Sequence, residues 1–374
     1  MAGKKIDFLI TDLAFGGAEL LVVRLASGLQ ARGWQVRVIS MMPPQAFEEE
    51  LRSEGIMVES LDMKRGIPNP AALFKLLRLL RSRRPDVVHC HMFHANLLGR
   101  ISRKPAGIAV LISTIHNMYE GARWRELANR YTATLSDVTT IISRKSGERM
   151  VRVGAISRDR LKVIPNGVDT VRYSCSETAR MELRDQLNAG DSFIWLAVGR
   201  FAEAKDHANM IRAYQRTRQA RGDTLLLLVG EGGLRRQAED LAEELGLSGQ
   251  VRFLGVRSDI PALMSAADAY LMSSSWEGMP LVLLEAASCR LPVVATDVGG
   301  NSEVVVDGTT GILAPPKDPE KLAAAMIRLM ELTDEGRQEM GLAGREYVEE
   351  HYSLDRMTDR WEELYYELIK RKVM

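Results

Sequence analysis

The sequence is poor in the residues that build disulfide scaffolds, metal clusters and membrane spans. Its 374 residues include three cysteines and six histidines, and only 6% are aromatic. The cysteines are far apart and show no Cys-x-x-Cys spacing, which excludes a structural zinc site and indicates a reducing compartment. No apolar run approaches the ~20 residues of a membrane span, and the N-terminal one is too short for a signal peptide. We therefore expect a cytoplasmic location, or peripheral attachment at the inner face of the cytoplasmic membrane.

A strong net charge is also absent. The chain carries 50 basic and 49 acidic residues, a formal charge of +1, which argues against a nucleic-acid partner. The balance conceals an asymmetry: residues 1–170 hold 26 basic and 16 acidic residues, whereas residues 171–374 hold 24 and 33. This difference has two interpretations. The basic half faces an anionic partner, or two independent surfaces simply differ.

The common nucleotide and metal signatures are missing. No G-x-G-x-x-G follows a strand-like run, and no G-x-x-x-x-G-K-[ST] occurs. These absences argue against dinucleotide-dependent oxidoreductases and P-loop NTPases. There is also no Asp-x-Asp and no metal-ligand spacing of His, Asp or Glu. A metal held by carboxylates is therefore not expected.

The chain does contain short apolar runs that alternate with amphipathic stretches. Examples are the runs Ile6–Ile10 and Phe193–Val198 and the helical patterns 18–32 and 209–221. Continuous apolar runs are typical of parallel strands buried on both faces. The alternation predicts two doubly wound α/β domains.

The boundary is expected within the polar stretch 169–191. We therefore predict one domain over 1–170 and a second over 171–351, followed by an amphipathic helix over 352–374.

Glycine-marked turns follow several of the predicted strands, at the sheet edge where α/β proteins bind ligands. Gly16 and Gly17 follow the first strand and open a helix, which suits either an approaching anion or a tight turn. Gly199 and Arg200 end the run 193–198, with Lys205 close behind. Two cations at this edge favour a phosphate site, and a solvated loop is the alternative.

The segment 276–286 (WEGMPLVLLEA) holds two glutamates eight residues apart. Glu277 precedes a predicted helix over 281–288, and Glu285 lies on its second turn. Gly278 and Pro280 are typical of a helix entry. Two acids beside free helix amides suit a ligand that carries both hydroxyl and phosphate groups. A solvated or capping role remains the alternative for Glu277, whereas the apolar surroundings of Glu285 make a surface role harder to explain.

This segment resembles the E-x7-E signature of retaining glycosyltransferases of family 4, which have the GT-B fold of two Rossmann-like domains. Further segments agree with the family in order along nearly the whole chain: FGGAE at 15–19, STIHN at 113–117, IPNGVD at 164–169, GRFAEAKDH at 199–207, LVGEGG at 228–233, VRFLG at 251–255 and PVVATDVGGNSEVV at 292–305. The resemblance is specific for fold and reaction type but says little about the sugar.

The resemblance implies that the C-terminal domain binds a nucleotide-diphosphate sugar. Arg200 and Lys205 match the diphosphate-binding pair, and helix amides at Leu281 and Val282 add to it, so no divalent metal and no cofactor are expected. Glu285 matches the residue that accepts hydrogen bonds from the ribose. Glu277 matches the residue that holds the transferred sugar, helped by amides of Gly278, Met279 and Pro280. The loop at Val256 and Arg257 matches the base contact.

The resemblance also assigns the N-terminal domain to the acceptor. Gly16 and Gly17 match a loop that closes over the diphosphate, and His116 matches a histidine near the reacting sugar, with capping of the strand end as the alternative. His91 is expected either to contact the acceptor or to be structural. The family implies front-face transfer with retention and no covalent intermediate. It also sends its last helix back to the first domain.

We expect transfer of a hexose or N-acetylhexosamine, from a UDP-sugar in preference to a GDP-sugar, to a glycan or lipid-linked acceptor in bacterial surface polysaccharide or lipopolysaccharide assembly. The alternatives are a sugar-nucleotide epimerase, a phosphorylase or an inactive binding subunit of the same fold. Basic residues at the ends of two predicted helices and along a third suggest an anionic membrane surface as a partner, although the helix dipole alone favours cations at helix C-termini and accounts for part of this clustering. These residues are Arg78, Arg81, Arg83, Arg84, Arg100, Arg103, Lys104, Arg123, Arg125 and Arg130.

Overall fold

The computed structural model describes residues 3–64, 66–67, 69–117 and 122–373. The chain forms two compact units, each with its own sheet and core. Unit 1 comprises Met1–Gly167 and Leu354–Met374, and unit 2 comprises Val168–Ser353. The first boundary between the units therefore follows Gly167, just before the polar stretch 169–191 in which it was expected.

The sheet of unit 1 has seven parallel strands in the order β3-β2-β1-β4-β5-β6-β7. Their bounds are β1 (Lys5–Ile10), β2 (Gln35–Ser40), β3 (Met57–Ser60), β4 (Val87–His91), β5 (Val110–Ile115), β6 (Val138–Ile141) and β7 (Leu161–Val163). Successive residues of β1, such as Phe8 and Leu9, are both fully buried because helices cover both faces.

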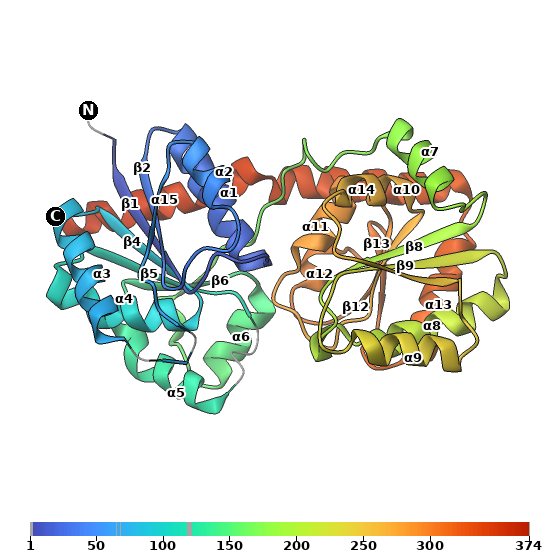
Figure 1. Cartoon of the computed structure of the whole chain (residues 1–374), viewed down its shortest axis with the longest axis horizontal. Helices are drawn as coiled ribbons and strands as arrows, with labels where there is room; N and C mark the ends of the chain where they lie inside the picture. Colours follow the sequence, from blue (N-terminus) through green and yellow to red (C-terminus); the bar gives the residue numbers. More distant parts are fainter. Residues whose placement is uncertain (1–2, 65, 68, 118–121, 374) are drawn as a thin grey trace. The chain divides into compact units, whose positions relative to one another are not determined.

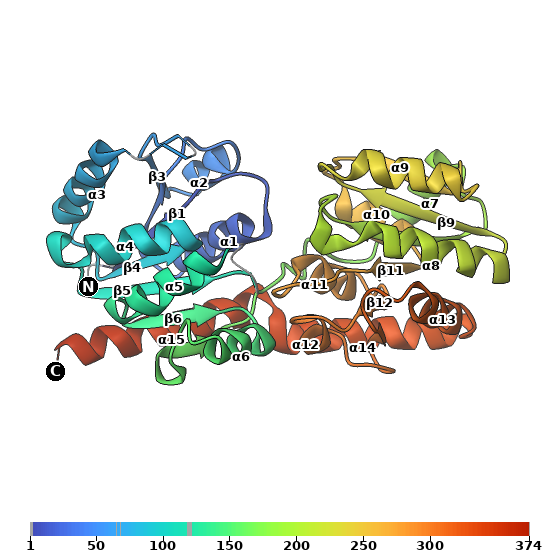
Figure 2. The same cartoon turned by 90° about the horizontal axis from the view of Figure 1, so that it is seen from below.

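Helices cover the two faces of this sheet in two groups. The apolar sides of α1 and α15 build the core on one face, and α3 and α4 build it on the other (Figures 1 and 2). The helices of unit 1 are α1 (Gly17–Ala31), α2 (Glu48–Ser53), α3 (Pro70–Arg83), α4 (Phe93–Ala106), α5 (Arg123–Thr132), α6 (Arg144–Arg152) and α15 (Leu354–Val373).

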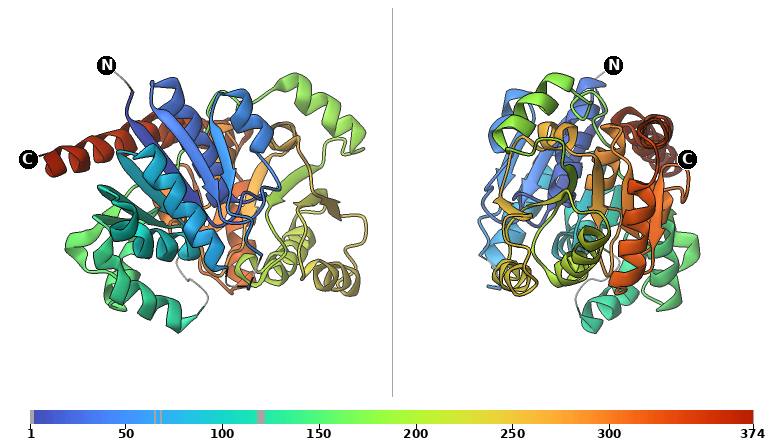
Figure 3. Two further views of the ribbon diagram at one scale, coloured as in Figure 1. Left: turned by 60° about the vertical axis from the view of Figure 1, so that its left-hand side comes forward. Right: turned by 90° about the vertical axis from the view of Figure 1, so that its right-hand side faces the viewer.

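The C-terminal helix α15 is part of unit 1. It runs beside α1 (Figures 1 and 3), and its Trp361 and Tyr365 side chains are fully buried in the core that α1 shares. The amphipathic pattern predicted one helix over 352–374. In the structure Tyr352 ends the preceding helix α14 (Asp334–Tyr352), and Met374 lies outside the described residues.

The sheet of unit 2 has six parallel strands in the order β10-β9-β8-β11-β12-β13. Their bounds are β8 (Phe193–Val198), β9 (Thr224–Val229), β10 (Val251–Gly255), β11 (Ala269–Met272), β12 (Val293–Thr296) and β13 (Gly311–Ala314). The order reverses between β8 and β11, and at such a point the loops after the two strands diverge and leave room for a ligand.

The helices of unit 2 also cover both faces of its sheet. The helices α8, α9 and α13 pack on one face, and α7, α10, α11 and α14 lie on the other (Figure 1). The bounds are α7 (Glu177–Gln186), α8 (His207–Ala220), α9 (Arg235–Glu244), α10 (Ile260–Ala266), α11 (Leu281–Ser288), α12 (Asn301–Val304) and α13 (Pro319–Met330).

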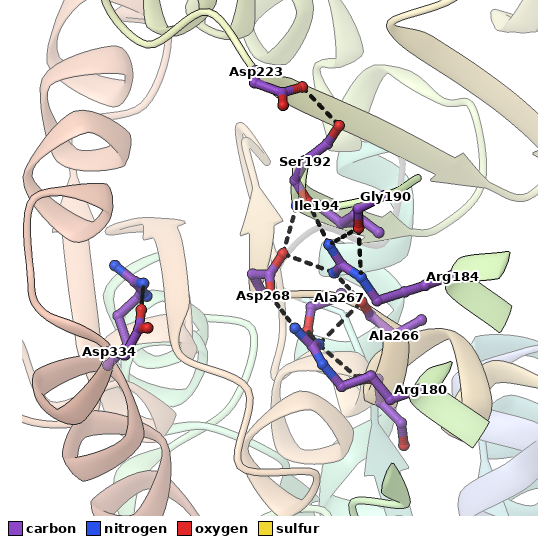
Figure 4. Close-up of polar contacts among 12 residues, drawn as sticks. Arg180, Arg184, Gly190, Ser192, Ile194, Asp223, Ala266, Ala267, Asp268 and Asp334 are labelled. Atoms are coloured by element: carbon purple, nitrogen blue, oxygen red, sulfur yellow. Dashed lines mark hydrogen bonds and ion pairs between the residues drawn. The ribbon is translucent and has the colours of Figure 1, made fainter. Parts of the chain in front are cut away.

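The polar stretch before β8 is a structural part of unit 2. Arg180 of α7 donates to the carbonyl of Ala267 at 2.8 Å, and both Arg180 and Arg184 bind the Asp268 carboxylate (Figure 4). The same carboxylate accepts the Ile194 amide at 2.8 Å. These contacts fix the starts of β8 and β11, so the cations of α7 are occupied at the sheet edge opposite to the strand ends.

Candidate functional site

In unit 2, the turn after β8 carries the first predicted residues. Arg200 is exposed and makes no hydrogen bond or ion pair with another residue that the structure describes. The Lys205 side chain runs over Gly199, so closely that a Cβ at Gly199 would lie 3.2 Å from Lys205 Cε. Glycine at 199 therefore makes room for the path of the lysine.

Lys205 and Glu277 form an ion pair. Lys205 ends a short 3₁₀ turn after β8, and Glu277 lies in the loop between β11 and α11. Lys205 Nζ lies 2.6 Å from Glu277 Oε1, and both side chains are largely buried. The pairing needs the reversal of strand order, since β8 and β11 are neighbours in the sheet but 70 residues apart in the chain.

Further contacts hold Glu277 in one orientation. Ser274 Oγ donates to Glu277 Oε1 at 2.7 Å, so this oxygen has two donors. Gly299 has a φ of +51°, and a Cβ there would lie 1.9 Å from the Glu277 carbonyl oxygen. Only glycine allows this approach. Oε2 has no hydrogen-bond partner among the described residues and can accept from a ligand.

The start of α11 offers amide groups beside Glu277. The helix begins at Leu281 after Pro280, and no described side chain caps it. The first amides of a helix lack intrahelical partners and carry a partial positive charge, which suits an anion. Gly278 accepts the Gly300 amide through its carbonyl at 2.7 Å, which fixes the loop, and Met279 is buried beneath it. Among the described residues, no group outside α11 accepts a hydrogen bond from the amides of Leu281 and Val282.

Glu285 is a buried carboxyl on α11. It is 6% exposed and hydrogen-bonded to the Tyr173 hydroxyl. Burial raises the pKa of Glu285 to about 7, an effect that the Tyr173 hydrogen bond and the Arg172 charge only partly offset. Tyr173 and Arg172 were not among the predicted site residues. The segment 164–169, which resembles the family, ends a few residues before them and was the only signal in this region.

The predicted base-contacting loop follows β10. Val256 is 75% exposed, and Arg257 pairs with Asp259, with Nε 2.8 Å from Oδ1. An exposed apolar side chain beside an anchored guanidinium is compatible with stacking against a base.

In unit 1, the turn between β1 and α1 holds Gly16 and Gly17. The Glu19 carboxylate folds back toward Gly16, where a Cβ would lie 2.3 Å from Glu19 Oε2. Glu19 is buried although it lies in the first turn of α1. The Glu19 carboxylate therefore lies at the start of α1, where we predicted a contact between Gly16, Gly17 and the diphosphate.

Three histidines meet at the ends of β4 and β5. His116, 8% exposed, follows β5, and its Nε2 lies 3.0 Å from Nδ1 of His91, which is fully buried. His89 is also fully buried and bonds Tyr365 and Thr114 through its two nitrogens, at 2.8 and 2.6 Å. His89 is therefore structural, and of the three only His116 retains exposed surface.

Several of the basic residues assigned to a surface in fact face inward. Arg83 pairs with Asp7 at 3.2 Å, and Arg100 donates to Asn129 Oδ1 at 2.7 Å from a 2% exposed position. Arg103 pairs with Asp137 at 2.7 Å. The expectation of a basic surface was wrong for Arg83 and Arg100, because a cation at a helix end can also satisfy buried acceptors.

The described residues lack both a metal-binding cluster and a membrane-spanning helix. No group of three or more His, Cys, Asp or Glu side chains is arranged to hold a metal ion. None of the helices in this part of the chain combines the length and apolar character that crossing a bilayer requires.

Comparison with known sequences decides the family. Residues 15–172 match the profile of Glycosyltransferase Family 4, and residues 179–347 match that of Glycosyl transferases group 1. The chain belongs to the family 4 glycosyltransferases. The prediction of family and fold class is thereby confirmed, and the two sheets correspond to the two Rossmann-like domains of GT-B.

The sequence relatives of this glycosyltransferase have diverse activities. UDP-Gal:alpha-D-GlcNAc-diphosphoundecaprenol alpha-1,3-galactosyltransferase of Escherichia coli is 25% identical, with 82% of this chain and 81% of that protein covered. GDP-mannose-dependent alpha-(1-6)-phosphatidylinositol monomannoside mannosyltransferase of Mycolicibacterium smegmatis is 29% identical, with 83% of each covered. Lipopolysaccharide core biosynthesis glycosyltransferase LpsD of Rhizobium meliloti is 28% identical, with 94% and 95% covered.

Solved structures share the fold of this glycosyltransferase. Anabaena Alr3699/HepE in complex with UDP superposes with a TM-score of 0.85 at 24% identity, over 97% of this chain and all of that one. WaaG, a glycosyltransferase involved in lipopolysaccharide biosynthesis, gives 0.74 at 21% identity, over 96% and 99%. These likenesses support the two-domain architecture.

Proposed function

We propose that this protein is a retaining glycosyltransferase that moves a hexose or N-acetylhexosamine from a UDP-sugar to a glycan or lipid-linked acceptor. One observation carries the proposal. In unit 2, a cation, a carboxylate with one open oxygen and the free amides of α11 gather beside the strand reversal. Such a set can bind a diphosphate and a sugar hydroxyl at the same time.

Each residue has a separate task in the proposed donor site. Arg200 and Lys205 bind the diphosphate, and the amides of Leu281 and Val282 add further donors. Charge-assisted hydrogen bonds of this kind contribute about 1.5–3 kcal/mol each. Their effect on rate is larger when they meet charge that develops in the transition state. Glu285 accepts from the ribose, and Oε2 of Glu277 accepts from the transferred sugar.

The Lys205–Glu277 pair also removes an electrostatic conflict. A free Glu277 carboxylate would repel a nearby diphosphate, and Lys205 neutralises it while keeping further donors for phosphate. The leaving diphosphate is stabilised by these fixed cations and amides. We propose that a phosphate oxygen takes the acceptor proton on the face from which the diphosphate leaves, so the sugar keeps its configuration and no divalent metal is needed.

Binding and activity measurements test the donor. A panel of UDP- and GDP-sugars is scored by thermal shift and by donor hydrolysis, with product stereochemistry read by NMR. We expect stabilisation by UDP and by one UDP-sugar, and an anomeric configuration that is retained in the product. Stabilisation by GDP-sugars alone would reject uridine, and an inverted product would reject the mechanism. Complete, reversible loss of activity in EDTA would reject metal independence.

We further propose that the acceptor is lipid-linked and that unit 1 meets an anionic membrane surface. The outward side of α5 carries Trp124, Leu127 and Tyr131, which are 54%, 51% and 75% exposed. Their spacing places them on one side of the helix, and Arg123 and Arg130 are exposed beside them. Aromatic and apolar side chains with neighbouring cations suit the interface of an anionic bilayer. If unit 1 binds such a surface, we propose that the protein lies at the inner face of the cytoplasmic membrane; without that contact, we propose a cytoplasmic location.

Liposome flotation tests the membrane proposal. We expect binding to vesicles of phosphatidylcholine with phosphatidylglycerol at low salt and little binding to phosphatidylcholine alone. Replacing Trp124, Leu127 and Tyr131 together by alanine should reduce the bound fraction several-fold. Met181→Ala is the matched control, since Met181 is 66% exposed on α7 of unit 2. Absence of binding to anionic vesicles at low salt would reject this step and leave the donor proposal intact.

A further inference from the structure

His91 and His116 are hydrogen-bonded histidines at the carboxyl ends of two strands of unit 1. His91 ends β4, His116 follows β5, and these strands are neighbours in the unit 1 sheet. His91 Nδ1 lies 3.0 Å from His116 Nε2, and the two rings are inclined by 32°. Nε2 of His116 is therefore occupied within the protein. Only its Nδ1 is left for an external partner.

Both rings are neutral near pH 7. Burial lowers the pKa of His116 to about 4. Burial also holds the pKa of His91 well below its usual value, and the neighbouring His89 and His116 rings lower the pKa of His91 further. A neutral imidazole carries one N–H donor and one acceptor nitrogen. The hydrogen bond between the two rings therefore has only two possible proton arrangements.

The surroundings of the remaining nitrogens distinguish these arrangements. His91 Nε2 is sealed from solvent without a partner, whereas His116 Nδ1 is not sealed in this way. If His116 donated, the proton of His91 would lie on Nε2 as a buried N–H without an acceptor, which folded proteins rarely tolerate. If His91 donates from Nδ1, its Nε2 carries no hydrogen. The second arrangement leaves the proton of His116 on Nδ1.

We propose that His91 is a positioning residue that fixes His116 as the Nδ1–H tautomer, so that His116 offers a hydrogen-bond donor to a substrate oxygen. In this state His116 acts neither as a base nor as a nucleophile at Nδ1. Its donor suits a hydroxyl oxygen of the sugar or acceptor. His91 itself needs no contact with substrate, which agrees with its complete burial. The link to substrate rests on the proposed function, but the tautomer does not.

The first experiment reads the tautomer without any activity. Protein labelled with ¹⁵N-histidine is studied by long-range ¹H–¹⁵N correlation near pH 7, and the His116 signals are assigned by their loss in His116→Gln. We expect a protonated Nδ1 and an unprotonated Nε2 on His116. The opposite pattern would overturn the inference, whatever the protein catalyses. His351, a partly exposed histidine of unit 2, serves as an internal reference.

The second experiment separates positioning from folding. His91→Phe removes the hydrogen bond and keeps a ring, whereas His91→Asn keeps an N–H near the place of Nδ1. We expect His91→Phe to give mixed His116 tautomers and to lower kcat by about 10- to 100-fold with little change in donor KM. His91→Asn should restore both to within a few-fold of wild type. An unchanged tautomer and kcat in a folded His91→Phe protein would overturn the role. A changed tautomer with unchanged kcat would instead reject the substrate contact proposed for His116.

Discussion

Lys205 Nζ lies 2.6 Å from Oε1 of Glu277, and the two residues come from loops that follow adjacent strands of the unit 2 sheet. The pair joins the side chain proposed to bind phosphate with the one proposed to bind the sugar. It holds one carboxylate oxygen and leaves the other open. Each residue therefore depends on its partner, and their substitutions should have different consequences.

Loss of the lysine should be severe. Lys205→Ala removes a phosphate donor and leaves the Glu277 charge facing the diphosphate without compensation. We expect kcat/KM to fall by at least ~100-fold, the range found when a donor that meets developing charge is removed. We expect a similar fall in kcat/KM for Arg200→Ala. Steady-state transfer with the preferred donor measures the effect.

The lysine prediction needs controls for general surface charge. Lys321→Ala and Arg212→Ala remove exposed cations from α13 and α8 of the same unit. Both should retain turnover within about twofold, as is usual for surface substitutions. Turnover of Lys205→Ala within a few-fold of wild type would reject its role.

Loss of the glutamate should separate binding from transfer. Glu277→Ala removes a negative charge near the diphosphate and frees Lys205 from its pair. We expect free UDP to bind as tightly as to wild type or a few-fold tighter, while transfer falls by at least ~100-fold because the sugar loses its acceptor oxygen. Calorimetry with UDP and turnover assays report the two effects. Equal losses in UDP affinity and turnover would contradict the assignment.

The sequence predicted much of this architecture, and its failures have physical causes. Long apolar runs such as Phe193–Val198 located the central strands. The strands β7 (Leu161–Val163) and β13 (Gly311–Ala314) were not among the predicted runs, because both are edge strands with interrupted apolar patterns: Lys162 divides β7, and β13 begins with a glycine. The spacing of Glu277 and Glu285 marked the site, but the pair with Lys205 depends on strand order.

Two contacts between segments that are distant in the sequence also escaped prediction. The Tyr173 hydroxyl meets Glu285 through packing between segments that are 112 residues apart, which no local pattern encodes. Arg100 was expected at the surface because it stands near the end of a helix. Its acceptor, Asn129, lies on a later helix, so only the folded chain shows that the guanidinium is internal.

A methyl group at Gly199 should disturb the lysine. The Cβ of Gly199→Ala would lie 3.2 Å from Lys205 Cε, tighter than an ordinary contact, so the side chain must shift by a few tenths of an ångström. We expect kcat to fall by about tenfold, given the sensitivity of catalysis to small misplacements. Gly222→Ala is the matched control, because a Cβ there meets no atom within 4 Å. Equal activities of the two variants would show that the path of Lys205 is not critical.

The buried carboxyl of Glu285 should destabilise the folded protein above neutral pH. Its pKa of about 7 in the folded state exceeds the usual 4.5. Folding is therefore favoured below pH 4.5, and this contribution is lost as the pH rises through 7. Glu285→Gln removes the buried negative charge. The free energy of unfolding should therefore rise at pH 8 by up to about 3 kcal/mol, with little effect near pH 4. Denaturant unfolding measures this. Glu339→Gln, at an exposed site on α14, should leave stability unchanged at both pH values.

The same carboxyl should make nucleotide binding depend on pH. Ribose hydroxyls donate to the ionised form of Glu285, so binding favours loss of its proton and lowers its pKa. With a pKa of about 7 in the free protein, only about a tenth of the molecules are ionised at pH 6, and UDP affinity should be about tenfold weaker there than at pH 8. Calorimetry in buffers of different ionisation enthalpy should detect proton release near pH 6.5.

Because UDP itself titrates in this range, Glu285→Gln provides the baseline. This variant should bind UDP more weakly than wild type at pH 8, and its UDP affinity should depend less on pH. An equal pH dependence in both proteins would mean that the ribose does not meet Glu285.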